Sequence, residues 1–545
     1  MEQFDLLIKN GLVVDGDKYD CSMVNIGIRN GKIQSIQSEL SAPAQTVIDA
    51  QSMIITPGFI DMHSHSDFMI PVTGSADSFI RQGITTSVVG MCGSSLAPIN
   101  PAKHNEYVKE IVKSVPLLSD VEISWNSYDE YLDEMERVQT SINFAFVVGY
   151  ESLRIACGAG FENRLPTKKE VKDMKILLAN AMKAGAFGMS TGLIYAPQVY
   201  AETSELIEIS KVLALHNGLY FSHIRGEGAS VFDAIKEVAQ IVSESGCRGG
   251  HIAHHKIADR GLWGKSIDSL KLIHEMNEKG ISITIDSYPY DRGCSSLITA
   301  LPPWVRVGGI EETLTRIRDE ETRKIIIAEV ENDLHGDEPA VWENWIKTAG
   351  FENIFMSTIE TEKWANATGS SINEIAEKQG LDEWEVFFSI LLDDAGATMV
   401  TLRFMSEEDI QRIMTSEHQM FGTDGMATTP KLKSGIDHPR SYGTYPRVLG
   451  KYVREEGTIS LTDAIRKMTF TPANRLGVTD RGRIETGAWA DLVIFDRETV
   501  ADMATYEEPN LFPVGIHYVL VNGEIVVDNG NQRRVYPGRV IRSQR

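Results

Sequence analysis

Residues 57–65 read Pro-Gly-Phe-Ile-Asp-Met-His-Ser-His, a short apolar strand pattern that ends in two histidines. Seven more short apolar runs follow along the chain, at 85–93, 143–151, 186–193, 219–228, 250–256, 282–290 and 419–425. Helical patterns separate several of them, and two of these, 170–185 and 231–246, end in glycine as helices often do. Strands that alternate with helices indicate βαβ units and a parallel sheet. Eight such units predict an α/β fold, a TIM-like (β/α)8 barrel.

The two ends of the chain carry a different pattern, typical of β-hairpins. Asn-Gly pairs interrupt apolar strand patterns at 10–11, 30–31 and 522–523. Neither end has enough strands to bury a core alone, so we expect both ends to pair into one small composite β-sandwich. The predicted division is therefore 1–56 with 475–545 for the sandwich and 57–474 for the barrel. Extra helical material around 296–358 predicts an insertion beside the active-site mouth.

Residues able to bind a metal follow five of the predicted strands. In a parallel barrel the carboxyl ends of the strands carry the chemistry. These ends deliver His63 and His65, Cys92, His223, His254 and Asp424. Each residue alone has an ordinary structural explanation, but together they form a set of N, S and O ligands that suits Zn²⁺.

The segment 250–256 holds three histidines, of which His254 and His255 point to opposite sides of an extended strand. His251 shares a side with His255. Spacing alone therefore does not choose between them.

The composition of the chain restricts its binding partners and its cellular compartment. A formal charge of −23 over 545 residues argues against nucleic acid and anionic membrane surfaces, which need a basic face. No apolar run is long enough to span a membrane, and the first residues do not resemble a signal peptide. Five scattered cysteines without a CxxC motif favour a reducing compartment, so we expect a cytoplasmic protein. No feature predicts an oligomeric state.

The sequence resembles the amidohydrolase superfamily and, within it, the D-aminoacylase or N-acyl-D-amino-acid deacylase family. The resemblance runs from Pro57 almost to the C-terminus, and its most specific stretches are PRVLG and the segment that ends in ADLVIFD. The stretches that carry it lie at 57–67, 85–98, 187–197, 222–228, 253–256, 421–425, 438–455 and 468–496.

The resemblance implies a role for each candidate residue. Cys92, His223 and His254 would hold one tightly bound zinc, and this favours His254 over its neighbours. His63 and His65 would frame a second, weaker metal position. Asp424 would be the catalytic acid and base. The fourth predicted strand has no lysine to bridge two metals, so Cys92 would take that role.

Three further residues, Lys256, Tyr288 and Arg440, resemble substrate-binding positions of the family, and two cations would suit a substrate carboxylate. The chain departs from the family at Tyr150, Glu151, Ile194 and Gln198. We expect these four to change the substrate. Tyr150 and Ile194 add apolar surface that should favour a larger or aromatic group, and the charge of Glu151 should repel N-acyl-D-glutamate and N-acyl-D-aspartate.

The predicted function is zinc-dependent hydrolysis of a linear C–N amide bond in a small N-acylated amino acid or related amide, releasing a D-amino acid. Two alternatives within the superfamily are a cyclic-amide hydrolase and a D-residue dipeptidase. A third is a non-catalytic scaffold, which should have lost metal ligands, although all the matching positions are filled here.

Overall fold

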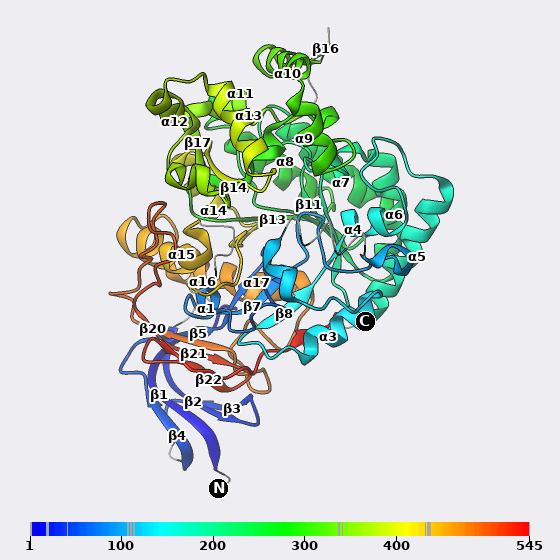
Figure 1. Cartoon of the computed structure of the whole chain (residues 1–545). Coiled ribbons are helices and arrows are strands. Elements are labelled where there is room, and N and C mark those ends of the chain that lie inside the picture. Colours follow the sequence, from blue (N-terminus) through cyan, green and yellow to red (C-terminus); the bar gives the residue numbers. More distant parts are fainter. Residues whose placement is uncertain are drawn as a thin grey trace.

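The structure is a computed structural model, and Figure 1 shows it as a helix-rich barrel with a β-sheet at the end that carries the N-terminus. It describes residues 3–17, 21–40, 42–105, 108, 112, 115–335, 338–339, 342–430, 432 and 438–543. Among these residues, no helix combines the length and apolar character needed to cross a bilayer.

Each of the eight predicted strand segments contributes a parallel strand to the barrel. The strands are β6 (Phe59–Asp61), β7 (Ile84–Val89), β8 (Asn143–Phe146) continued by β9 (Val148–Gly149), β10 (Gly188–Gly192), β11 (Leu219–His223), β12 (Gly249–Ile252), β13 (Ile283–Ser287) and β19 (Gln419–Phe421). Backbone hydrogen bonds from Met62 N to Phe421 O (3.3 Å) and from Asp424 N to His63 O (2.8 Å) join the last strand to the first. The barrel interior is a packed core that includes Met62, Val88, Phe221 and Met420.

Helices surround the strands, and capping residues define where they begin and end. The predicted helix 170–185 corresponds to α5 (Lys168–Ala184), which begins at a capping box between Thr167 and Glu170 and ends at Gly185, where φ is 115°. The other helices of the barrel region are α1 (Asp77–Ile80), α3 (Tyr128–Arg137), α4 (Tyr150–Ala156), α6 (Thr203–Leu215), α7 (Val231–Ser245), α8 (Ser266–Glu278), α14 (Glu407–Thr415), α15 (Arg440–Arg447), the π-helical η10 (Val448–Glu455), α16 (Leu461–Met468) and α17 (Phe470–Leu476).

The two chain ends share one nine-stranded sheet, in which β5 pairs antiparallel with β20. Its strands are β1 (Phe4–Val14), β2 (Cys21–Arg29), β3 (Lys32–Gln37), β4 (Ala44–Asp49), β5 (Ile54–Pro57), β20 (Leu492–Phe495), β21 (Ile516–Val521), β22 (Glu524–Asp528) and β23 (Asn531–Gln532). Side chains from both ends, including Ile26, Ile55 and Ile494, build a core of their own. This confirms the composite β-unit predicted from the sequence.

Of the three Asn-Gly pairs for which we predicted hairpin turns, those at 30–31 and 522–523 form them. The third prediction was wrong, because Asn10 and Gly11 lie inside β1 at a bulge where the register with β2 shifts. A Cβ on Gly11 would lie 2.0 Å from the Ile55 side chain, so close packing against β5 explains this glycine.

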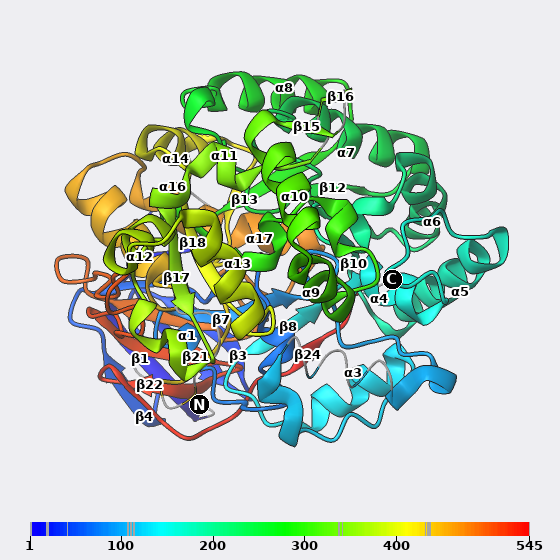
Figure 2. The same ribbon diagram turned by 45° about the horizontal axis from the view of Figure 1, so that its top comes forward.

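The segment between β13 and β19 is longer than the predicted insertion at 296–358. It contains a three-stranded antiparallel sheet in the order β14-β18-β17 and several helices. Its elements are β14 (Arg292–Ser296), α9 (Ile310–Arg318), α10 (Glu320–Asn332), β15 (Leu334–His335), β16 (Glu338–Pro339), α11 (Trp345–Ala349), β17 (Ile354–Thr358), α12 (Ile372–Gln379), α13 (Glu383–Asp393) and β18 (Met399–Arg403). Helices α9 to α13 lie at the top of Figure 1 and come to the front in Figure 2.

One short strand near the C-terminus does not belong to the nine-stranded sheet. Strand β24 (Val540–Ile541) pairs parallel with β8, so this part of 475–545 contacts the barrel directly. Helix α17 also spans the predicted boundary at 474–475. The division into 1–56 with 475–545 and 57–474 remains a prediction.

Candidate metal centre

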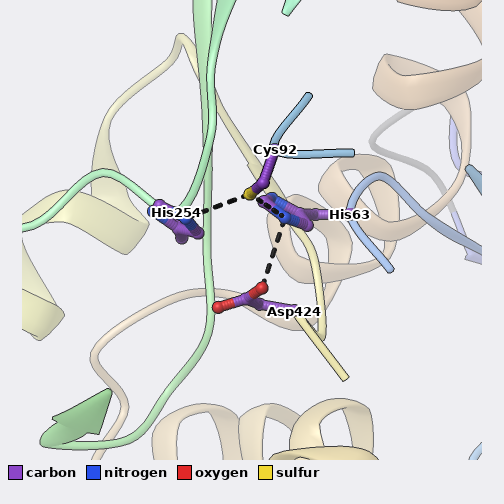
Figure 3. A group of neighbouring side chains, drawn as sticks. All are labelled: His63, Cys92, His254 and Asp424. Carbon is purple, nitrogen blue, oxygen red and sulfur yellow. Dashed lines mark hydrogen bonds and ion pairs between the residues drawn. The ribbon is translucent and has the colours of Figure 1, made fainter. Parts of the chain in front are cut away.

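Four of the predicted residues meet at the carboxyl ends of the barrel strands, as Figure 3 shows. Ligand atoms of His63, Cys92, His254 and Asp424 all lie within 4.8 Å of one another, and all four residues are buried. His63 Nε2 lies 3.3 Å from Cys92 Sγ and 3.3 Å from Asp424 Oδ1. His254 Nε2 lies 3.7 Å from the same sulfur.

The remaining two predicted ligands border this cluster. His223 Nδ1 lies 3.8 Å from Cys92 Sγ, and its Nε2 is buried without a hydrogen-bond partner among the described residues. His65 Nε2 lies 3.2 Å from Asp424 Oδ1. The structure therefore brings together all six residues for which the sequence predicts metal or proton-transfer roles.

The structure also separates the three histidines of the 250–256 segment. His251 Nε2 lies 2.9 Å from Asp286 Oδ2, and His255 Nε2 lies 2.9 Å from the Ser269 hydroxyl. Of the three, only His254 belongs to the cluster around Cys92.

Neighbouring charges and hydrogen bonds lower the pKa values of two side chains in the cluster. Burial alone would raise the pKa of the Cys92 thiol, but the charge of His63 and hydrogen bonds with His223 and His254 hold it well below its ordinary value. Burial would likewise raise the pKa of Asp424, yet Arg440 and His63 hold that pKa well below its usual range. Cys92 is therefore disposed to be a thiolate, the form that ligates metals.

The sequence analysis missed two carboxylates that orient the cluster. Glu227 Oε1 lies 2.9 Å from His254 Nδ1 and accepts a hydrogen bond of 2.6 Å from Lys256 Nζ. Asp286 Oδ2 lies 3.3 Å from His63 Nδ1, and its Oδ1 accepts from the His254 backbone N–H at 3.0 Å. Asp286 could have been suspected from the sequence, because it is an acidic residue inside an apolar strand pattern.

The three predicted substrate residues lie beside the cluster. Two cations lie near the Tyr288 ring, with Arg440 Cζ 5.0 Å and Lys256 Nζ 5.9 Å from its centroid. Both cations also contact carboxylates, because Lys256 binds Glu227 and Arg440 Nη1 donates to Asp424 Oδ2 at 2.6 Å. Arg440 Nε is buried without a partner in the described part of the chain, so this side chain keeps one donor for a ligand.

Three of the four departures from the family pattern form side-chain hydrogen bonds within the protein. The Tyr150 hydroxyl is hydrogen-bonded to Glu205, which commits it to that partner. Gln198 Nε2 donates to Cys92 O at 3.0 Å, and Gln198 Oε1 accepts from Gly192 N at 2.6 Å. This side chain therefore supports the loop that carries Cys92.

Glu151 accepts hydrogen bonds from the Ser94 hydroxyl and Gln198 Nε2. Its burial raises the pKa of the carboxyl to about 7. This weakens the expected repulsion of acidic substrates, which assumed a fully charged Glu151.

The donor set fits zinc on chemical grounds. Thiolate and imidazole are the ligands that zinc prefers, and Cys92 Sγ lies within 3.8 Å of a ring nitrogen of each of His63, His223 and His254. Glu227 and Asp286 supply the carboxylates that commonly orient metal-binding histidines.

Comparisons with known proteins give one consistent result. The sequence model of the amidohydrolase family matches residues 46–527. N-acyl-D-glutamate deacylase from Alcaligenes xylosoxydans xylosoxydans is 34% identical, over 99% of this chain and 97% of its own length. D-aminoacylase from the same organism is 31% identical, over 99% of this chain and 98% of its own length.

A solved structure is also similar to this chain over nearly its whole length. It is N-acyl-D-glutamate deacylase from Bordetella bronchiseptica, complexed with zinc and a phosphonate inhibitor that mimics the tetrahedral intermediate. The two chains align with a TM-score of 0.82 and 31% identity, covering 99% of this chain and 100% of the other.

Proposed function

Because the chain belongs to the amidohydrolase family, we propose that it hydrolyses linear amides with zinc and deacylates N-acyl-D-amino acids to a D-amino acid and a carboxylate. One observation carries the proposal, the meeting of Cys92, three histidines and Asp424 at the ends of separate barrel strands. The D configuration and the amino-acid substrate rest on the activities that name the relatives.

In this proposal Cys92, His223 and His254 would hold the tight zinc. His63 and His65, which both lie close to Asp424, would frame a second, weaker metal position, and Cys92 would serve both positions. Zinc bound here would supply a Lewis acid that polarises the scissile carbonyl and eases deprotonation of water. Glu227 keeps His254 oriented through Nδ1.

Asp424 is the proposed proton carrier. It takes a proton from the attacking water as oxygen adds to the amide carbon, and it returns that proton to nitrogen as the C–N bond breaks. The low pKa of Asp424, caused mainly by Arg440 and His63 against the effect of burial, keeps the carboxylate ready to accept.

Arg440 and Tyr288 would position the substrate. The Nε of Arg440, which has no partner among the described residues, can donate to the α-carboxylate of the amino acid. Burial raises the pKa of Tyr288 well above its ordinary value, so its hydroxyl stays protonated and can donate to the developing oxyanion. Lys256 adds positive charge on the same side while it remains paired with Glu227.

Paired substrates test the proposed function. Zinc-loaded protein is incubated with N-acetyl-D-methionine and N-acetyl-L-methionine, and release of the free amine is followed. We expect release from the D compound alone, at a rate that falls by about 10² or more with Asp424→Asn. Equal rates for both enantiomers, or turnover only of a hydantoin or a D-dipeptide, would overturn the deacylase assignment. A protein without bound zinc would instead favour the scaffold alternative.

The proposed setting is the cytoplasm. Five scattered cysteines without a CxxC motif favour a reducing compartment. We propose a small N-acylated amino acid or related amide as the partner, and the net charge of −23 disfavours nucleic acid and anionic membranes.

A further inference from the structure

A second group of side chains able to bind a metal lies at the other end of the last barrel strand. Beyond its carboxyl end, β19 leads to Asp424 in the metal centre, and His418 immediately precedes its amino end. Ligand atoms of His274, Glu417 and His418 lie within 4.8 Å of one another. This group shares no residue with the metal centre, and the length of β19 separates the two.

The three side chains come from two segments that meet on the outside of the barrel. His274 belongs to α8, whereas Glu417 and His418 form the turn between α14 and β19. His274 Nδ1 lies 3.1 Å from Glu417 Oε1, and His418 Nε2 lies 3.8 Å from the same oxygen. The centroids of the two imidazole rings are 5.7 Å apart. Two imidazoles and one carboxylate therefore face a common point.

One ring nitrogen of this group is buried without a partner. His418 Nε2 forms no hydrogen bond with any residue that the structure describes. Burial lowers the pKa of His418 against the effect of Glu417, so the ring is neutral at neutral pH. A neutral imidazole gains little from an ion pair with Glu417, but it is the form that binds a metal. A cation at the common point would give this nitrogen its partner.

The surroundings hold both histidines in place. His274 Nε2 lies 3.6 Å from Glu278 Oε1, one helical turn further along α8, so its Nδ1 is left to face Glu417. Metal-binding histidines commonly have their second ring nitrogen held by a carboxylate in this way. The His418 backbone is fixed as well, because its oxygen accepts from Ile285 N at 3.0 Å.

The nearby charges allow a cation to bind. Glu417 and Glu278 place two carboxylates beside the histidines. Lys467 is the basic side chain that acts on His418, but its Nζ donates to Ser416 O and to Gln419 Oε1. Burial also lowers the pKa of Lys467 to about 7, so part of the population is uncharged at neutral pH. This lysine therefore opposes a cation only weakly.

From the convergence of these side chains and the unpartnered His418 Nε2, we infer that His274, Glu417 and His418 form a peripheral zinc site, separate from the metal centre. Imidazole and carboxylate ligands suit Zn²⁺, whereas Ca²⁺ and Mg²⁺ prefer oxygen ligands alone. The side chains of His274 and Glu417 are 50% and 70% exposed, so water can complete the coordination. The ion joins α8 to the turn before β19, and it stabilises the folded chain.

The zinc content of the protein tests this site. Zinc-loaded protein is dialysed against micromolar free Zn²⁺, and elemental analysis gives zinc per chain. His274→Ala should hold one zinc fewer than the parent protein. His517→Ala is the matched control, because this histidine belongs to none of the potential metal groups among the described residues, and it should match the parent. Equal zinc in the parent and His274→Ala, or the same loss in His517→Ala, would overturn the inference.

Glu278→Gln tests how the site is held. It keeps all three ligands but removes the carboxylate beside His274 Nε2. The affinity for the peripheral zinc should therefore fall by about tenfold or more, the usual effect of losing such a carboxylate. An unchanged zinc affinity in this variant would contradict the proposed orientation of His274.

Thermal unfolding provides a measurement that does not depend on counting zinc. Raising free Zn²⁺ from a level that fills only the metal centre should raise the midpoint of the parent by about 3 °C or more. The midpoint of His274→Ala should not respond in this way. A rise of equal size in both proteins would overturn the inference. Neither zinc content nor the midpoint depends on amide hydrolysis, so the peripheral site and the proposed function are tested separately.

Discussion

Three residues at the centre of the site hold left-handed backbone conformations that residues with side chains usually avoid. The φ angles are 53° at Cys92, 35° at His254 and 49° at Asp424. Hydrogen bonds oppose this strain, since Cys92 O accepts from Gln198, His254 N donates to Asp286 and Asp424 N donates to His63 O. The surrounding structure thus imposes conformations that bring three side chains to one point.

Cys92 is predicted to control zinc binding. Cys92→Ala removes the sulfur that lies within 3.8 Å of three imidazole nitrogens, so the tight zinc and the activity should both be lost. Elemental analysis of the purified protein measures zinc per chain. Cys247→Ala, a change at a buried cysteine in a different cluster, is the control and should retain zinc. Undiminished zinc in Cys92→Ala would contradict the assignment.

Asp424 is predicted to control proton transfer rather than metal affinity. Asp424→Asn keeps the shape of the side chain but cannot accept the proton, so kcat should fall by about 10² or more. Zinc content and the circular dichroism spectrum should match the parent protein. Turnover near that of the parent would show that another group carries the proton.

At the scale of elements, strand segments were predictable because the barrel strands lie in short, mainly apolar runs that alternate with helical patterns, and several runs end in residues able to bind a metal. His63, Cys92, His223, His254 and Asp424 could be grouped for that reason. The roles of Gln198 and Glu227 were not predictable, because each depends on a contact between segments that are distant in the sequence.

The insertion was only partly predictable from the sequence. Its sheet pairs β14 with β18, whose residues lie more than one hundred positions apart, and local patterns carry no information about such pairing. The bulge in β1 was missed for a similar reason. An Asn-Gly pair suits a hairpin turn as well as a bulge, and contact with Ile55 decides between them.

The loop after β7 is predicted to be intolerant of a side chain at Gly93. This glycine has φ of 82°, and a Cβ there would lie 1.8 Å from Gln198 Oε1, the atom that also accepts from Gly192 N. Gly93→Ala should cost about 2–4 kcal/mol in free energy of unfolding and weaken zinc binding, because it disturbs the support of Cys92. Urea unfolding and zinc titration measure both effects.

Gly280→Ala is a matched control for this prediction. Gly280 has φ of 83°, but no atom of the described residues lies within 4 Å of the point where its Cβ would stand. Gly280→Ala therefore introduces backbone strain without a steric clash. It should lower the free energy of unfolding by about 1–2 kcal/mol and leave the zinc affinity unchanged. Equal effects of the two substitutions would show that the contact with Gln198 is unimportant.

At the scale of the whole molecule, both chain ends are tied into the same framework. The pairing of β5 with β20 joins residues near the start and end of the chain, and β24 adds to β8 in the barrel. Arg542 donates to Asp133 at 2.7 Å and to Ala184 O at 2.9 Å, next to that added strand.

Removal of the residues after Arg539 is predicted to destabilise the barrel. The change deletes β24 and leaves one edge of β8 without its partner. We expect the midpoint of thermal unfolding to fall by about 3 °C or more, since each kcal/mol shifts Tm by about 2–4 °C in a large domain. Arg542→Ala keeps β24 but loses the contacts of Arg542, so its midpoint of thermal unfolding should fall less than that of the truncated chain. An unchanged midpoint in the truncated chain would contradict a structural role for β24.

The sharing of one sheet by both ends also sets an order of events during synthesis. The N-terminal strands leave the ribosome first, but β5 cannot meet β20 until more than four hundred further residues have been made. At a translation rate of about 5–20 residues per second this wait lasts about twenty seconds or longer. Throughout it the apolar edge of β5 is open to other chains, so expression should depend on chaperone supply.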